Sequence, residues 1–144
     1  MYILNSFNPS LSSMTTYKFH PLNFSGSKDV FMGSFMIIEQ FINAKVIQMV
    51  AYVNAVINRT IHYTELDNFI IDTMSEWTLL NVVDETPSSA QERVFWHLVH
   101  EISVNGAQAL KDDLFFKSEI NTCLDFFNGV GSYPIDCIGW RPIA

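Results

Sequence analysis

Residues 30–57, VFMGSFMIIEQFINAKVIQMVAYVNAVI, are the stretch of this 144-residue chain that decides its fold. Apolar side chains recur along it at steps of three and four residues, which is the spacing of one face of an α-helix. These positions are Phe31, Phe35, Ile38, Ile42, Val46, Val50, Val53 and Ile57. Because Gly33 and the β-branched residues after Val46 weaken helix propensity, the stretch predicts either one long helix or two helices in line.

The same stretch is apolar enough to raise the question of a membrane span. Polar and charged residues interrupt it, namely Glu39, Gln40, Asn43, Lys45, Gln48 and Asn54. Such groups are costly in lipid, so the pattern favours a helix buried in a soluble protein. The first residues, MYILNSFNPSLSSM, lack the basic segment that precedes the apolar part of a secretory signal. We therefore expect a cytoplasmic protein that makes no membrane contact.

Outward from this stretch, the chain divides into an irregular leader, residues 1–27, and a single helical domain, residues 28–144. The leader is rich in Ser, Asn, Thr and Pro and has no sustained helical period. A chain of this length is expected to form one domain and to bury about 68–70% of its unfolded surface. Because 49% of its residues are hydrophobic, the chain is no disordered acidic tail.

A second helix is predicted to start near Thr64, whose hydroxyl is placed to cap it, with Asp67 three residues further on. A third helix is predicted to start either at Ser89, with Glu92 three residues on, or at Thr86 before a proline.

The third helix is predicted to end at Asn105-Gly106, and a fourth helical stretch covers residues 110–127 and ends before Gly129. Residues 131–142 contain too much Gly and Pro for a helix. The fold class that follows is mostly α, a single-domain bundle of about four helices with an extended C-terminal tail.

The acids of this chain are concentrated in one window. Between Arg59 and Arg93 there is no lysine and no arginine, but there are seven acids. They are Glu65, Asp67, Asp72, Glu76, Asp84, Glu85 and Glu92. The whole chain has 15 acids and 8 bases, so the formal net charge of −7 lies in this window. A one-sided negative field favours a basic partner and opposes direct binding of nucleic acid.

Position on the predicted helices sorts these acids into two groups. Asp67 and Glu92 are interpreted as helix-start residues, which offset the macrodipole. Glu65, Asp72 and Glu76 are predicted to share one side of the second helix, away from its apolar face. No lysine follows them at the i+4 position, so a basic partner is one interpretation and a solvated helix face is the other.

One group of residues could bind a metal ion. His97, His100 and Glu101 stand at helical spacing, and imidazole with carboxylate suits zinc or iron. Their order differs from the short metalloprotease motifs, and packed histidines are the commoner interpretation. We therefore expect no metal and no cofactor, and we keep a small metal-dependent helical enzyme as the alternative.

Other catalytic signatures are missing from the sequence. It contains neither a GxSxG turn nor the glycine-rich phosphate loops GxGxxG and GxxxxGK[ST]. Its two cysteines, Cys123 and Cys137, are expected to be free thiols, with a single disulfide as the alternative. No catalytic residue is therefore predicted.

The C-terminal segment YPIDCIGWRP, residues 133–142, is rich in residue types that dominate protein interfaces. These are Tyr133, Trp140 and Arg141. The alternative is that Tyr133 and Trp140 fold back with Ile135 and Ile138 to cover the end of the bundle.

Three segments of the C-terminal half resemble one protein family. They are VFWHLVHEI (residues 94–102), ALKDDLFFKSEINTCLDFF (residues 109–127) and YPIDCIGWRP. Over about residues 90–142 the chain is similar to small bacterial immunity proteins of contact-dependent growth inhibition systems. The resemblance implies a cytoplasmic protein without enzymatic activity. Such a protein binds the C-terminal toxin domain that a neighbouring cell delivers, and many of these toxins are basic nucleases.

The acid window and the resemblance predict the same kind of partner, a basic nuclease or tRNase domain bound by a monomeric immunity protein. The predicted partner-binding residues are Glu65, Asp72, Glu76, Asp84, Glu85 and Trp140. A third possibility is a homo-oligomeric regulator that buries the apolar surface of residues 30–57 in a dimer.

Overall fold

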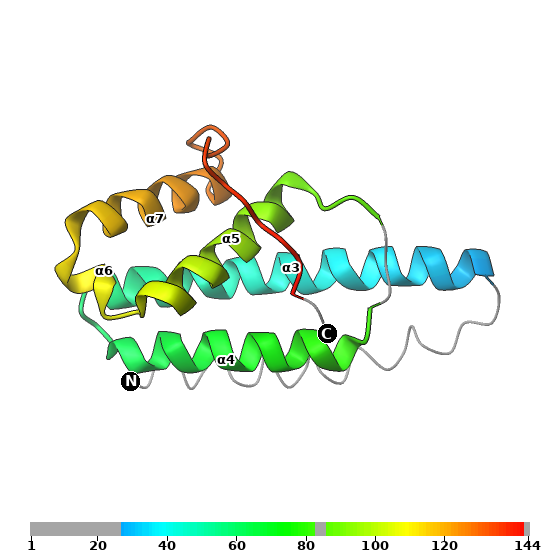
Figure 1. The fold of residues 1–144 in the computed structure, drawn as a ribbon, viewed down its shortest axis with the longest axis horizontal. Helices are drawn as coiled ribbons and strands as arrows, with labels where there is room; N and C mark the ends of the chain where they lie inside the picture. The colour runs from blue at the N-terminus through cyan, green and yellow to red at the C-terminus, as the bar shows by residue number, and fades with distance from the viewer. Residues whose placement is uncertain (1–26, 83–85, 143–144) are drawn as a thin grey trace.

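The computed structural model describes residues 27–82 and 86–142, with side chains from residue 37 onward. Its regular elements are five helices: α3 (Ser27–Ile57), α4 (Tyr63–Leu80), α5 (Ala90–Asn105), α6 (Ala109–Asp112) and α7 (Leu114–Phe127). Beyond α7 an irregular tail, residues 128–142, runs back across the bundle (Figure 1). The predicted helical bundle and extended tail are confirmed, whereas the leader lies almost wholly outside the described residues.

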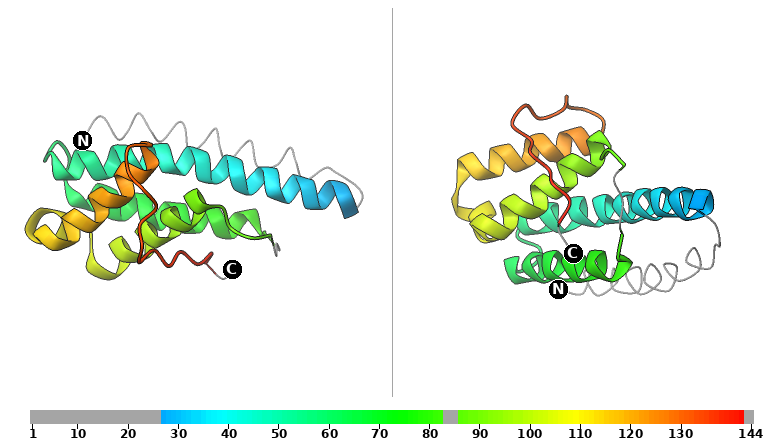
Figure 2. Two further views of the ribbon diagram at one scale, coloured as in Figure 1. Left: turned by 90° about the horizontal axis from the view of Figure 1, so that it is seen from above. Right: turned by 45° about the vertical axis from the view of Figure 1, so that its right-hand side comes forward.

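Helix α3 is the centre of the bundle, as its apolar pattern suggested. It is one continuous helix, and it contacts each of the other four. α4 lies beside α3 and runs in the opposite direction, and α5 packs on both, while α7 packs on α3 and α5 (Figures 1 and 2). The tail passes over α5 toward the C-terminal end of α4 (Figure 1).

The apolar face of α3 is buried within the chain itself. Between residues 37 and 57 its buried hydrophobic side chains are Ile38, Phe41, Ile42, Val46, Met49, Tyr52, Val53 and Val56. A dimer that used this face would compete with the bundle core, so the structure gives the predicted oligomeric alternative no free apolar face on this part of α3.

An aromatic cluster joins the three longest helices. The ring centroids of Phe41 in α3 and Trp77 in α4 lie 5.6 Å apart, and those of Trp77 and Trp96 in α5 lie 4.9 Å apart. Phe41 and Trp96 complete the triangle at 6.3 Å. Aromatic pairs at such distances contribute about 0.5–1.5 kcal/mol each beyond their burial. Trp77 therefore belongs to the core.

The helix ends agree with most of the predicted boundaries. Ser89 caps α5 by accepting a hydrogen bond from the Glu92 amide at 3.1 Å, which confirms one of the two predicted starts. The predicted cap at Thr64 is wrong, because the cap of α4 is His62, whose Nδ1 accepts from the Thr64 amide at 3.3 Å. The predicted fourth helical stretch is divided into α6 and α7 by Asp113, which caps α7.

Within the described residues, no helix combines the length and the hydropathy that crossing a bilayer requires.

Candidate functional site

Glu76 is not part of an exposed acidic stripe. It is buried, and its Oε1 accepts a hydrogen bond from Nζ of Lys45 in α3 at 2.9 Å. Lys45 is 0% exposed, and its ammonium also lies 5.6 Å from the ring centroids of Phe41 and Phe69. The prediction that Glu76 binds a partner is therefore corrected, since its charge is neutralised inside the bundle.

Glu65 and Asp72 of α4 also lie near α3, where both act on Tyr52, and both are more exposed to solvent than Glu76. Glu65 is half-buried, and Asp72 is exposed. Burial raises the pKa of the Tyr52 hydroxyl in α3, and the carboxylates of Glu65 and Asp72 raise that pKa further. The other two acids predicted for this surface, Asp84 and Glu85, lie outside the described residues. Of the predicted acidic surface, the structure therefore places only Glu65 and Asp72 near one another.

Asp67 has a different role from the predicted helix start. Its Oδ1 accepts a hydrogen bond from the amide of Ala107 at 3.2 Å, so it ties the first turns of α4 to the loop after α5. Its carboxylate stabilises the fold instead of facing a partner.

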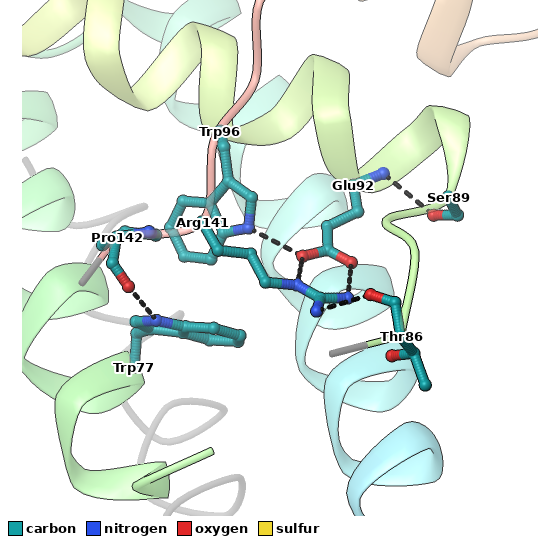
Figure 3. Close-up of polar contacts among 7 residues, drawn as sticks. All are labelled: Trp77, Thr86, Ser89, Glu92, Trp96, Arg141 and Pro142. Atoms are coloured by element: carbon teal, nitrogen blue, oxygen red, sulfur yellow. Dashed lines mark hydrogen bonds and ion pairs between the residues drawn. The ribbon is translucent and has the colours of Figure 1, made fainter. Parts of the chain in front are cut away.

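Glu92 forms the second internal ion pair, with Arg141 of the tail (Figure 3). Nε of Arg141 donates to Oε2 of Glu92 at 2.6 Å, and Nη2 donates to Oε1 at 2.8 Å, so the contact is bidentate. The indole N–H of Trp96 donates to the same Oε2 at 3.0 Å, and Nη1 of Arg141 donates to the carbonyl of Thr86 at 2.9 Å. We call Glu92, Trp96, Thr86 and Arg141 the C-terminal latch.

The tail also contacts α5 and α4 through its backbone. The Ile138 amide donates to Nδ1 of His97 at 3.4 Å, and the indole N–H of Trp77 donates to the carbonyl of Pro142 at 3.2 Å (Figure 3). A Cβ on Gly139 would lie 1.7 Å from the carbonyl oxygen of Arg93, so only glycine fits this approach.

The large apolar residues of the tail divide into two groups. Tyr133 packs on the bundle, with its ring centroid 5.6 Å from that of Phe126. In contrast, Ile135 is 96% exposed, Ile138 is 65% exposed and Trp140 is 80% exposed. The expectation that all four cover the bundle end is therefore correct for Tyr133 and wrong for the other three.

The tail and α5 enclose a pocket of about 360 Å³, which we call the tail groove. It is lined by His97, His100 and Glu101 of α5 and by Asp136, Ile138 and Trp140 of the tail. A second pocket of about 440 Å³ shares His97, Glu101 and Asp136 with it, so the two adjoin. Among the described residues, no lysine or arginine lines either pocket, whereas Glu119 adds a third acid.

The predicted metal-binding group lines this groove without forming a metal site. His97, His100 and Glu101 all contribute to its wall. Nevertheless, in residues 37–82 and 86–142 no three His, Cys, Asp or Glu side chains are arranged to hold an ion. Within these residues, the geometry gives the metal-enzyme alternative no coordination site.

Both cysteines are free thiols, and Cys123 of α7 and Cys137 of the tail both line the second pocket. Burial raises the pKa of the Cys123 thiol to about 12, and burial also raises the pKa of Cys137. The Cys137 Sγ donates to the Arg93 carbonyl oxygen at 3.4 Å. At neutral pH both remain protonated, so neither is set up as a nucleophile.

The sequence did not predict the internal contacts of three residues, namely Lys45, Arg141 and Gly139. Lys45 carried a usable signal, because it lies four residues after Phe41 on an apolar face, where a charge requires a partner. Arg141 and Gly139 carried none, since their partners Glu92 and Arg93 lie more than forty residues upstream.

No protein-family model matches the chain, and neither a curated protein nor a solved structure matches it.

Proposed function

We propose that this chain is a cytoplasmic immunity protein that binds a basic toxin domain, a nuclease or tRNase, and neutralises it without enzymatic activity of its own. One observation carries the proposal. The residues with described side chains include twelve acids and six bases, and the two internal pairs, Lys45–Glu76 and Arg141–Glu92, use two of each. When these two pairs are subtracted, ten acids and four bases remain among the residues with described side chains. The two internal ion pairs therefore leave the excess of negative charge unchanged.

The charge surplus suggests a mechanism. A negative surface accelerates encounter with a basic protein and repels the nucleic acid on which that protein acts. Aromatic side chains that lose their water on binding slow dissociation of a complex. Trp140 is exposed in the free chain and is an aromatic side chain that a partner would cover. Neutralisation then follows because the bound acids occupy the surface that would otherwise hold substrate phosphates.

The direct test uses the C-terminal domain of an exported protein, if sequencing finds one encoded beside this gene, and we call it the candidate toxin domain. Its association with the full chain is measured at low and at high ionic strength, together with its nuclease activity. We expect stoichiometric inhibition and an association rate that falls about tenfold or more as salt rises. Absence of binding, or inhibition with an association rate indifferent to salt, would contradict the proposal.

A further inference from the structure

We propose that the tail groove is the docking site for an arginine-bearing segment of the partner, an inference that rests on the proposed function and assigns it a specific surface. The groove combines two chemistries in one place. Its apolar wall is formed by Ile138 and by Trp140, which is 80% exposed. Its acidic wall is formed by Glu101 and Asp136. A partner segment that matches both must carry positive charge and apolar surface together.

Charge complementarity identifies the basic residue. Within the described part of the chain, no lysine or arginine lines the groove, so no basic side chain of the lining neutralises its carboxylates, and the Oε2 of Glu101 accepts only a neutral donor, the Asn105 amide, at 3.4 Å. Tryptophan is the side chain with the strongest attraction for a cation over its ring face. A planar guanidinium can stack on an indole and donate to carboxylates at its edge at the same time, which an ammonium cannot do equally well. The groove therefore selects arginine over lysine.

The groove's backbone is fixed in advance of binding. The Ile138 amide is held by His97, and Arg141, one residue after Trp140, is held by Glu92. Gly139, which directly precedes Trp140, is fixed by its close approach to the Arg93 carbonyl. Because the backbone on both sides of Trp140 is anchored, its exposure follows from how the tail is held. A preorganised indole binds without the entropy cost of ordering a loop.

The adjoining pocket extends the same surface toward α7. It adds Glu119 and Ile135, so a longer partner segment would again meet an acid beside an exposed aliphatic side chain. The partner segment that fits has arginine between aliphatic residues. In contrast, the junction of Glu65 and Asp72 faces Tyr52, whose side chain is buried, and carries no tryptophan.

The groove is tested first with a defined ligand. A short peptide with arginine between two leucines is titrated into the full chain, with a citrulline peptide of the same length as control. The readout is the NMR signal of the Trp140 indole N–H, assigned with a Trp140→Phe variant. The buried indoles of Trp77 and Trp96 serve as internal references. We expect the arginine peptide to shift the Trp140 signal and to bind about tenfold more tightly than the citrulline peptide.

The second arm uses the candidate toxin domain with four single variants of the full chain. Trp140→Ala and Glu101→Gln are each expected to weaken its binding about tenfold. Phe115→Ala and Asp112→Asn are the matched controls, because both side chains are exposed and lie outside the groove. They are expected to leave the affinity within about twofold.

The outcomes separate the groove from the proposed function. If the domain binds the wild type and all four variants with the same affinity, the groove is overturned and the proposed function stands. If the domain does not bind while the arginine peptide still prefers Trp140, the groove is supported and the proposed function fails. If the arginine and citrulline peptides behave alike and the groove variants bind the domain normally, the inference is overturned.

Discussion

The junction between α3 and α4 and the junction between α5 and the tail use the acid-rich window in different ways. In the first, Glu76 meets Lys45, which is fully buried among aromatic rings, and the pair belongs to the packing of two long helices. In the second, Glu92 meets Arg141, whose side chain keeps 17% of its exposure, and the pair fastens an irregular segment to a helix. One pair holds the core, whereas the other holds a surface in place.

The comparison shows why an acid in the sequence is no guide to a binding surface by itself. Glu76 and Glu92 contribute to the net charge of the window, yet each forms an ion pair with a base from a distant part of the chain. Exposed acids of the tail groove, by contrast, lie outside the window, at residues such as Asp136. Tertiary pairing therefore decides which acids remain at the surface.

The largest expected effect breaks the α3–α4 pair. Lys45→Met leaves the Glu76 carboxylate buried without its base, and we expect a loss of about 3–5 kcal/mol in the free energy of unfolding. The double variant Lys45→Met/Glu76→Leu removes both charges and is expected to recover most of that loss. Urea denaturation at neutral pH measures both. If the single and double variants were equally stable, the buried pair would not have the importance given to it.

A smaller loss is expected at the C-terminal latch. Arg141→Gln leaves Glu92 with Trp96 but without its bidentate base, and we expect a loss of about 2–3 kcal/mol because this pair is partly hydrated. Arg141→Lys retains the charge but loses the bidentate geometry, so its free energy of unfolding should lie between those of the wild type and Arg141→Gln. Hydrogen exchange at the Ile138 amide should rise strongly in Arg141→Gln and stay unchanged in the folded Lys45→Met/Glu76→Leu variant. Equal protection of Ile138 in the wild type and Arg141→Gln would mean that the latch does not hold the tail.

The tail can also be displaced without changing any charge. Gly139→Ala places a methyl group against the Arg93 carbonyl oxygen, so the tail or α5 must shift, at a cost of about 1–2 kcal/mol. Ile135→Ala is the control in the same tail, because Ile135 is almost fully exposed and should change stability by less than about 0.5 kcal/mol. Thermal unfolding compares them. A Gly139→Ala protein as stable as the control would contradict the close approach.

The last expected effect appears only at alkaline pH, where the raised pKa values of Tyr52 in α3 and Cys123 in α7 reduce the stability of the fold. The Cys123 thiol has a pKa of about 12 in the folded chain against 9.0 as its ordinary value, and burial also raises the pKa of Tyr52. A raised pKa gives stability that is complete below pH 9 and is lost as pH rises, because only the unfolded chain ionises. Each such group contributes a slope of at most about 1.4 kcal/mol per pH unit.

Cys123→Ala tests the thiol's share of that slope. The variant should be less stable at neutral pH because of the cavity, yet it should lose less stability than the wild type between pH 9 and pH 11. Parallel stability curves for the two proteins over this pH range would show that Cys123 is not shielded from ionisation.

Much of the fold could be predicted from local sequence. Ser89 marks the start of α5 through its side-chain cap, and Gly106 marks the end through its positive φ. The apolar period of residues 30–57 identified the central helix. The cap at His62 could not be predicted in the same way, because an imidazole accepts an amide hydrogen bond only in one tautomer. The division of the predicted fourth helix into α6 and α7 could not be predicted either, because the cap at Asp113 lies within a continuous helical apolar period.

The proposed binding surface was less accessible to prediction from sequence. Glu76 pairs with a residue 31 positions upstream and Glu92 with one 49 positions downstream, so no local pattern showed that either carboxylate is internal. The type of Trp140 suggested an interface residue, but its exposure depends on where Gly139 and Arg141 hold the tail. Charge could be counted from sequence, whereas its distribution over the surface needed the tertiary contacts.

The most direct test of the central claim is a hydrogen-exchange footprint of the full chain bound to the candidate toxin domain. The account predicts that binding protects amides of the tail groove, residues 97–101 and 135–140, and leaves residues 65–79 of α4 unchanged. Protection confined to residues 65–79, with the tail exchanging as in the free chain, would contradict it.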